Sequence, residues 1–481
     1  MKNTFIITLT VLAVIKGSGC TAGNQDIYRK PETVKLKQPL KETLKGQSYD
    51  NVSDSQDVSA AQKCGLELTL EQCLETAFEN NPEIMQRQWD TETSLAGKDI
   101  AEGALWPTIS AEGGYEHFRE DRLIQPRRPG TSEVLQFTDD LVSGDIVLNM
   151  PLYTGGRLQN QVKAADLLAK SAQHQLAHSQ RELVFNITSV FYSMLGQKEV
   201  INSLIFSQET LREHFKRTKE LMEAQKAAHV DLLRTEVRLA DIEQQLLRER
   251  NTLDIQRFLL TSLLGCDTET EVLDIKGQLI LGDIPDELDR GFTLAMAYRQ
   301  DYQSLISRVD VQRKMLDVAK SRRLPEISLR ASYGSRWDSD DFDEDNEVGS
   351  VGLFAEMPLF EGGRIDAGIR RERSRLRSIE ESLRRLKLQI QVEVETAASN
   401  IESTRARVGV TEKAVEMAKE SLRIEREKYD LGKGAIVDVL DAQSALLSSQ
   451  MNYYRALADC NTAIAQFRQA AGLPCGDDVN P

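Results

Sequence analysis

The sequence predicts a mainly helical protein with a small membrane β part, built from one unit of two strands and long helices that occurs twice. Three observations lead to this prediction. The stretch "MPLYTGGRL" at Met150–Leu158 returns as "MPLFEGGRI" at Met357–Ile365, 207 residues later. Alternating apolar and polar residues precede each copy. A long proline-free stretch with a seven-residue apolar period follows each one.

The N-terminus has the pattern of an export signal. Lys2 is followed by an apolar stretch from Phe5 to Ile15 and by small residues before Cys20, as in a bacterial lipoprotein signal. We therefore predict a signal peptide at 1–19 and lipidation of Cys20, with simple cleavage or a retained anchor as alternatives. Residues 20–65 are polar and without period, which is typical of a tether.

The repeat extends far beyond the shared turn. At the offset of 207, "HVDLL" at His229–Leu233 stands opposite "IVDVL" at Ile436–Leu440. Upstream, "WPTIS" from Trp106 stands opposite "LPEIS" from Leu324 at an offset of 218, so the first copy has the longer loop between its strands. This register predicts a first repeat at 66–265, a connector at 266–291, a second repeat at 292–472 and a tail at 473–481.

Each copy contains two candidate strands. After Pro107, Ile109 and Ala111 lie on one face and polar residues on the other, and the pattern recurs after Pro325. Strands of roughly 10 residues with one apolar face are typical of transmembrane β-structure. A half-buried hairpin of a soluble sandwich is the alternative. We expect Pro151 and Pro358 to end strand pairing, because proline lacks the N–H that a ladder needs.

Long helices are expected after each turn. The heptad positions are Val162, Ala169, Leu176, Leu183 and Val190 in the first copy, and Ile369, Leu376, Leu383, Ile390 and Ala397 in the second. A helix from Leu158 to about Gln225 is on the order of 100 Å long, which exceeds the thickness of a bilayer. It must therefore project away from the membrane. Breaks at Lys226–Asp231 and Lys433–Asp438 predict the far tips of helical hairpins.

Composition excludes several classes of function. The formal net charge of −15 argues against nucleic acid as a partner. No phosphate loop or metal-binding cysteine pair occurs, so we expect no enzyme, no cofactor and no metal. His174 and His178 have the spacing of half a zinc site, but exposed helix histidines are the alternative. Four strands per chain are too few to close a barrel, and open edges are not tolerated in lipid, so several chains must assemble.

The order of these motifs resembles the outer membrane efflux protein family, the TolC-like trimeric exit ducts, in its lipoprotein branch. The resemblance covers Leu66 to Gly472. It is carried by "NNPEI" at Asn80, the two "GGR" turns, and "YDLGKGAIVDVLDAQ" at Tyr429–Gln443. It implies a trimeric outer-membrane β-barrel continuous with a periplasmic coiled-coil α-barrel.

The resemblance also implies a function. The chain is expected to lie in the outer membrane, in contact with its lipids and lipid-anchored, and to extend into the periplasm. As a homotrimer it would export cargo passively, driven by an inner-membrane transporter through a periplasmic adaptor protein. The nature of the cargo, whether drug, metal ion or polypeptide, stays open. A structural periplasmic coiled-coil lipoprotein without a channel is the alternative.

The family likeness further implies a gate at the second tip. Asp438 and Asp441 lie three residues apart on one helical face, and Tyr429 and Lys433 stand nearby. The family places acidic residues here, whereas Gly434 replaces the arginine of its prototype. A helix N-terminus that attracts Asp438, with Asp441 merely solvated, is the alternative. The adaptor-docking tips are predicted at Ala228, His229, Val230, Asp231, Gly434, Ala435, Ile436 and Val437.

The acidic run at Asp338–Glu347 has two interpretations. It is predicted to lie in the loop between the strands of the second copy, where it would bind divalent cations or stay solvated.

Overall fold

The computed structural model describes residues 67–124, 137–224, 228–266, 273–286, 288–338 and 341–473, with the side chains of 341–345 excepted. The predicted signal peptide, Cys20 and the tether at 20–65 lie outside the described residues. So do tip residues 225–227 and the tail from 474 onward. Of the acidic run, residues 339–340 and the side chains of 341–345 are likewise outside them.

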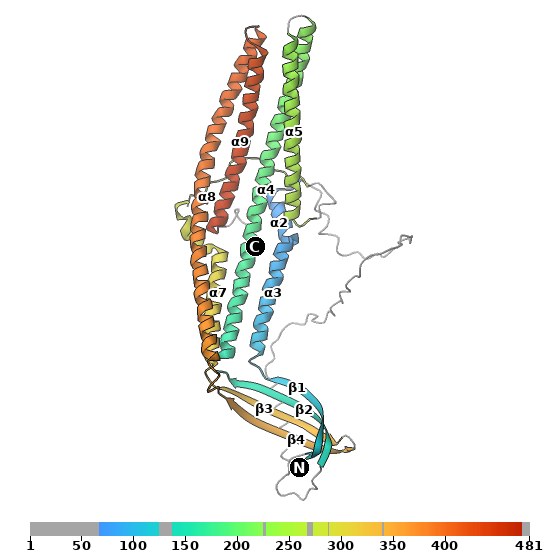
Figure 1. Cartoon of the computed structure of the whole chain (residues 1–481). Helices are drawn as coiled ribbons and strands as arrows, with labels where there is room; N and C mark the ends of the chain where they lie inside the picture. Colours follow the sequence, from blue (N-terminus) through green and yellow to red (C-terminus); the bar gives the residue numbers. More distant parts are fainter. Residues whose placement is uncertain are drawn as a thin grey trace, which may run out of the picture. The chain divides into compact units, whose positions relative to one another are not determined.

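The elements follow one another in two similar sets. The first set is α2 (Leu70–Asn80), α3 (Pro82–Gly103), β1 (Thr108–Leu123), β2 (Phe137–Tyr153), α4 (Arg157–Glu223) and α5 (His229–Leu263). The second is η1 (Leu288–Arg290), α6 (Gly291–Tyr298), α7 (Gln300–Ser321), β3 (Glu326–Asp338), β4 (Asp341–Glu356), α8 (Arg364–Asp430) and α9 (Ile436–Ala471). Both α4 and α8 contain 67 residues, and both α3 and α7 contain 22. The predicted duplication is confirmed (Figure 1).

The four strands form one antiparallel sheet in the order β1-β2-β3-β4. They contain 16, 17, 13 and 16 residues, so the prediction of about 10 was too short. Pro151 does not end strand pairing either. It lies opposite Ser328, and β2 continues to Tyr153 after a shift in register. Proline removes only one hydrogen bond of the ladder, and the strand pairing resumes after the shift in register between Pro151 and Tyr153.

The register places apolar residues side by side across the whole sheet. Ile109 pairs with Leu148, Leu148 with Ala331, and Ala331 with Val351. Their face is exposed: the exposed fraction is 63% for Ile109 and 77% for Val351. An exposed apolar surface that crosses four strands marks contact with a partner or a lipid phase. Separately, no helix in the described part of the chain is both long and apolar enough to span a membrane.

Both "GGR" turns use backbone conformations that favour glycine. Gly155 and Gly156 have φ of 62° and 81°, and Gly362 and Gly363 have φ of 57° and 79°. These values lie in the left-handed region, which residues with a Cβ rarely adopt. These glycines therefore allow the sharp turn that leads into α4 or α8. In the first copy Arg157 then donates to both carboxylate oxygens of Glu326 at the start of β3, at 2.9 and 3.1 Å.

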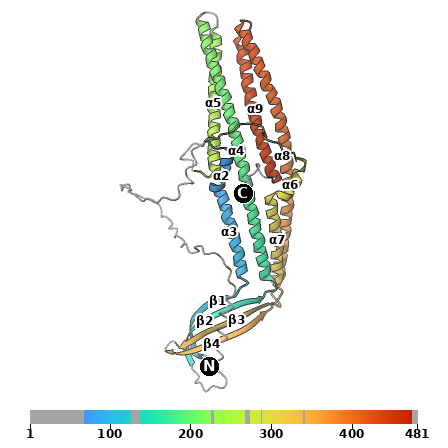
Figure 2. The same ribbon diagram turned by 180° about the vertical axis from the view of Figure 1, so that it is seen from behind.

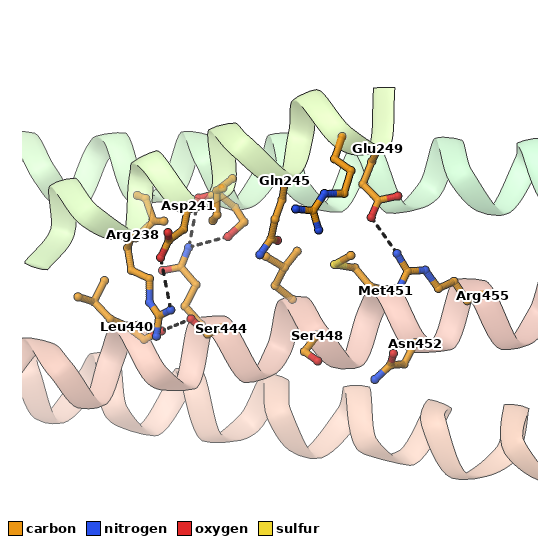
Figure 3. A pocket seen from close by; sticks show the side chains of 16 residues that line it. Arg238, Asp241, Gln245, Glu249, Leu440, Ser444, Ser448, Met451, Asn452 and Arg455 are labelled. Carbon is orange, nitrogen blue, oxygen red and sulfur yellow. Dashed lines mark hydrogen bonds and ion pairs between the residues drawn. The ribbon is translucent and has the colours of Figure 1, made fainter. Parts of the chain in front are cut away.

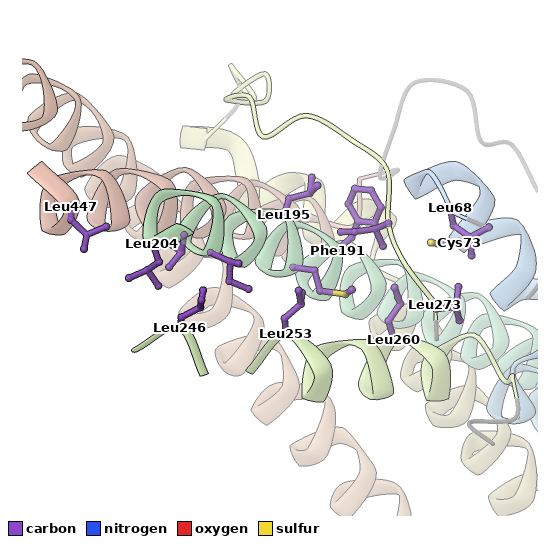
Figure 4. Packing of buried hydrophobic residues seen from close by; sticks show 14 of the residues in the cluster. Leu68, Cys73, Phe191, Leu195, Leu204, Leu246, Leu253, Leu260, Leu273 and Leu447 are labelled. Carbon is purple, nitrogen blue, oxygen red and sulfur yellow. The ribbon is translucent and has the colours of Figure 1, made fainter. Parts of the chain in front are cut away.

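The helices pack side by side in a layer. Helix α4 contacts α3, α5, α7 and α9, and α8 contacts α7 and α9 (Figure 2). All ten predicted heptad positions are buried or half-buried, which confirms the coiled-coil pattern. One core cluster surrounds Phe191 and Leu260 (Figure 4), and a second surrounds Ile390 and Phe467. Cys73 and Cys460 are buried free thiols within these clusters.

Residues 273–286 cross both helical hairpins, and we call this segment the belt. Asp274 forms an ion pair with Lys198 of α4 at 2.6 Å, and the Ile275 carbonyl accepts from the same ammonium group at 2.7 Å. At its other end the Gly282 N–H donates to the Asn461 side chain of α9, which in turn donates to the Ile280 carbonyl, both at 2.8 Å. The belt thus ties the two hairpins together midway along their length.

Candidate functional site at the helical tips

The second hairpin turns from α8 to α9 through a glycine-containing loop. Gly432 has φ of 67°, and its N–H donates to the Tyr429 carbonyl at 2.9 Å. The Lys433 N–H donates to the Lys428 carbonyl, also at 2.9 Å. This pair of bonds around a left-handed glycine is the Schellman arrangement, which closes a helix end. Tyr429 is half-buried against the core, and Lys433 is exposed.

Asp438 closes the first turn of α9. Its carboxylate accepts from the Ala435 N–H at 3.4 Å, and its own N–H donates to the Ala435 carbonyl at 3.2 Å. A negative charge at this position is favourable, because the N-terminus of a helix carries a partial positive charge. The alternative interpretation of Asp438 as a helix-end residue therefore accounts for its backbone contact. Its side chain nevertheless stays exposed to solvent.

Asp441 has a partner on another hairpin. Its carboxylate accepts from the Arg238 guanidinium of α5 at 3.3 Å, and its side chain is 66% exposed. Arg238 also lies 4.0 Å from Asp241 on its own helix. Asp441 is therefore an exposed carboxylate with one ion-pair partner. Because the pair is exposed, its net stabilisation is about 0.2–1 kcal/mol, and the local charge is its larger consequence.

A second ion pair joins the hairpins near the same end. Arg217 of α4 lies 3.1 Å from Asp430 of α8. His214, one helical turn before Arg217, is half-buried. Burial, followed by the positive charges of Arg426 and Arg217, holds the pKa of His214 below its ordinary value, against the opposing charges of Asp430 and Glu213. Protonation of His214 is therefore disfavoured at the contact between α4 and α8.

A polar groove of about 440 Å³ lies between α5 and α9 (Figure 3). Arg238 and Leu440 line it near the tips, and Arg455 donates to Glu249 at 2.9 Å farther along. Gln443 enters from α9 and donates to Ser207 of α4 at 3.3 Å. At this level the two hairpins of one chain thus meet through charged and amide side chains beside the buried apolar core, to which Leu440 and Leu447 belong.

The first tip has a similar but simpler construction. Ala228 precedes α5, and the Asp231 N–H donates to its carbonyl at 3.0 Å. Asp231 lies 3.7 Å from Arg234, one turn along the helix. Ala228, His229 and Val230 are exposed, and Asp231 is half-buried. These residues are placed where a partner can reach them.

One predicted docking residue of the second tip needs correction. Ile436 is only 3% exposed and belongs to the core cluster, so it holds the turn in place rather than presenting itself to a partner. Ala435 is exposed, whereas Gly434 and Val437 are half-buried. The other predicted residues of this tip therefore remain accessible at least in part.

Sequence reasoning missed Arg238. A signal was present in the repeat: at the offset of 207, Asp231 stands opposite Asp438, but Arg234 stands opposite Asp441. The first copy thus balances its tip carboxylate within one helix, while the second carries two carboxylates and needs a cation from elsewhere. That comparison pointed to a missing cation without identifying it.

The two histidines of α4 do not share a site. His174 lies 2.7 Å from the Gln300 side chain, and His178 lies 4.0 Å from Glu182. Within the described residues, the one group of side chains spaced to hold a metal ion is His117, Asp139 and Asp140 of the sheet. Within this group Asp140 lies 2.7 Å from His117, and it also accepts a hydrogen bond from Tyr115.

Comparison with a family model places most of the chain in one group. Residues 73–266 and 293–473 match the model described as outer membrane efflux protein. The outer membrane protein TolC of Vibrio cholerae is 23% identical over 412 residues, which covers 84% of this chain and 90% of that protein. The alkaline protease secretion protein AprF of Pseudomonas aeruginosa is 24% identical over 401 residues, covering 82% and 83% respectively.

Solved structures have the same fold. The outer membrane protein VceC from Vibrio cholerae superposes with a TM-score of 0.70 at 16% identity, covering 84% of this chain and 96% of that one. The shared architecture consists of long helices joined to a small β part.

Proposed function

Because the chain belongs to the outer membrane efflux protein family, we propose that it is the outer-membrane exit duct of a tripartite export system. In this proposal it gives cargo a passive route across the outer membrane. An inner-membrane transporter supplies the energy, and a periplasmic adaptor connects the two. The same family membership places the chain among transport proteins rather than enzymes.

The observation that carries the proposal is the direct connection of the sheet to the long helices. One sheet face is apolar and exposed across all four strands. Tyr153 at the end of β2 is separated from α4 by only three residues. A chain that anchors such a sheet in lipid carries helices on the order of 100 Å long into the adjoining aqueous space. That length suits a duct that reaches toward the inner membrane.

The same sheet supports assembly into a homotrimer. Strands β1 and β4 each pair on one side only within the described residues. An open strand edge in lipid leaves backbone N–H and C=O groups without partners, at a cost of several kcal/mol for each group. We infer that β4 of one chain pairs with β1 of the next and that three chains close the barrel. Lipidation of Cys20 would add a second anchor.

The adaptor is expected to meet the tips, because they are the described parts farthest from the sheet along α4 and α8. The exposed residues Ala228, His229 and Ala435 are the proposed contact points. Asp438 and Asp441 are the proposed carboxylates of the duct entrance, with Arg238 partly compensating the second.

Two measurements on the full-length protein test this function. Native mass spectrometry in detergent is expected to give a trimer, and planar bilayers containing the protein are expected to show discrete ion conductance. A stable monomer would contradict the barrel assembly. A protein that stays with membranes, forms no trimer and is silent in bilayers would instead support the periplasmic coiled-coil lipoprotein without a channel.

A further inference from the structure

A basic groove of about 330 Å³ lies between α7 and α8, at the ends of these helices that join the sheet. It is lined by Arg322, directly after α7, by Arg364, Arg371 and Arg375 of α8, and by the apolar side chains of Met315 and Ile365. Helix α7 ends at Ser321, five residues before β3 begins, and α8 begins eight residues after β4 ends. The basic groove therefore sits at the junction between helices and strands.

One buried carboxylate, that of Glu372, holds two arginines of the basic groove in place. Glu372 is 7% exposed and accepts from Gln312, Arg371 and Arg375, each at 2.9 Å. Burial raises the pKa of Glu372, but the hydrogen bonds from Gln312 and Arg371 and the charge of Arg375 outweigh this and hold the pKa below its ordinary value. The carboxylate thus stays ionised and fixes two guanidinium groups at one position.

These guanidinium groups keep donors available. Each contacts Glu372 through one nitrogen, and the Arg371 and Arg375 side chains are 64% and 60% exposed. A guanidinium has five N–H donors in a planar fork that matches phosphate geometry. Arg322 is also exposed and has no ion-pair partner among the residues that the structure describes. Three arginines can therefore approach one anion.

The floor of the groove is apolar and open. Met315 is 37% exposed, and Ile365 is half-buried. Gly368 contributes no side chain, and no heavy atom lies within 4 Å of the position that its Cβ would occupy. A ligand that fits has a negatively charged group for the arginines and an apolar part for this floor.

The duplication supplies an internal comparison. At the offset of 207, Ala164 and Leu168 stand where Arg371 and Arg375 stand, and Ala165 stands in place of Glu372. At the offset of 218, Ala104 stands in place of Arg322. The same helix pair thus folds without these charges in the first copy, so they are not a requirement of the architecture. Residues 364–387 carry nine Arg or Lys and four Asp or Glu, in a chain of net charge −15.

We propose that the basic groove binds the headgroup of an anionic phospholipid from the periplasmic leaflet of the outer membrane. Arg322, Arg371 and Arg375 contact the phosphate, while Met315 and Ile365 contact the first carbons of the lipid. The inference rests on the proposed function, since it needs the sheet to lie in the membrane and the helix junction at the headgroup level. Basic pockets between membrane helices bind anionic lipid headgroups in the same way.

The test measures lipid binding to the full-length protein by native mass spectrometry in detergent. Phosphatidylglycerol is titrated against zwitterionic phosphatidylethanolamine. The triple variant Arg322→Gln, Arg371→Gln, Arg375→Gln is compared with a control that removes three arginines of α8 outside the groove, Arg377→Gln, Arg384→Gln, Arg385→Gln. Since each arginine near a lipid surface is worth about 1 kcal/mol, or about fivefold, the first variant should lose more than about 25-fold in phosphatidylglycerol affinity. The control should lose less than about fivefold.

A second variant keeps every charge and blocks the space. Gly368→Leu places a side chain in the open groove without a clash at its Cβ, and it should reduce phosphatidylglycerol binding while the protein remains folded. Unchanged binding in both groove variants would overturn the proposal. Full competition by inorganic phosphate would also overturn it, since the site would then be one for a free anion.

Bilayer recordings test the remaining possibility, that the arginines line the interior of the duct. If the arginine triple variant changes ion selectivity while lipid binding is unchanged, the arginines line the duct interior and the lipid proposal is wrong. A wild-type protein without conductance would contradict the proposed function, and lipid binding would still be read independently in the mass spectra.

Discussion

Arg238 of α5 and Asp441 of α9 join the two helical hairpins of one chain, 203 positions apart in the sequence, through a bond of 3.3 Å. The first hairpin thereby supplies a positive charge for Asp441. Its own residue at the equivalent position is Arg234, so it has no such carboxylate. Charge at the tip is consequently set by the contact between hairpins as well as by the sequence of α9.

The first prediction concerns ion selectivity. Asp438→Asn combined with Asp441→Asn should lower cation selectivity and abolish block by trivalent cations in planar bilayers, because a ring of carboxylates favours cations. Arg238→Gln should act in the opposite direction, since it leaves Asp441 uncompensated. Trimers should stay intact in both variants. Selectivity and block unchanged in the double variant would show that these carboxylates do not line the entrance.

A second prediction tests docking. Cysteines introduced at Ala228 or Ala435, both exposed at the tips, should crosslink to a periplasmic adaptor in intact cells. A cysteine at the exposed mid-helix residue Val392 serves as the matched control and should not. Adaptor crosslinks from Val392 alone would rule out the tips as the contact surface.

The duplicated turns allow a matched pair of glycine substitutions. Gly155→Ala and Gly362→Ala impose the same left-handed strain, on the order of 1–2 kcal/mol. At Gly155 the new Cβ would also lie only 2.7 Å from the Cβ of Leu324. At Gly362 no heavy atom lies within 4 Å of the new Cβ. Overpacking adds about 1–3 kcal/mol. Thermal unfolding followed by circular dichroism should therefore show a lower Tm for Gly155→Ala, and equal values would contradict the close approach.

His214 should make stability depend on pH. Its pKa is lowered in the folded protein, so the folded state favours the neutral ring. The resulting contribution to the free energy of unfolding is complete above the ordinary pKa of 6.5. It is lost as the pH falls below that value, because the unfolded chain then binds the proton more readily. The Tm of the wild type should consequently drop more between pH 7.5 and 5.5 than that of His214→Gln. Identical slopes would contradict the assignment.

The sequence was informative wherever the structure depends on local pattern. The two "GGR" turns, the heptads of α4 and α8, and the second tip at Lys433–Asp438 follow from local sequence patterns, and all were predicted. The resemblance to the efflux family is confirmed by the family match. Strand lengths were underestimated because the ladders continue beyond the apolar band into polar residues such as Asp338, which pairs with Asp341.

Long-range charge pairing could not be predicted. Arg238 meets Asp441 only because α5 and α9 come to lie side by side along the polar groove. Glu372 lies in a run that resembles a solvated helix surface, yet it is buried against α7 through Gln312. In both places the partner is decided by tertiary packing, which the spacing along one helix does not specify.

The belt holds each hairpin at a point far from its tip. It grips α4 at Lys198 and α9 at Asn461, each 25 residues from the tip end of its helix, or roughly 38 Å at the helical rise. A bend of the helices at the belt is therefore magnified along the part beyond it. A tilt of about 10° there displaces the tip by about 7 Å, more than one helical turn. A small change of helix direction at the belt would therefore change the position of the tips much more than that of residues near the belt.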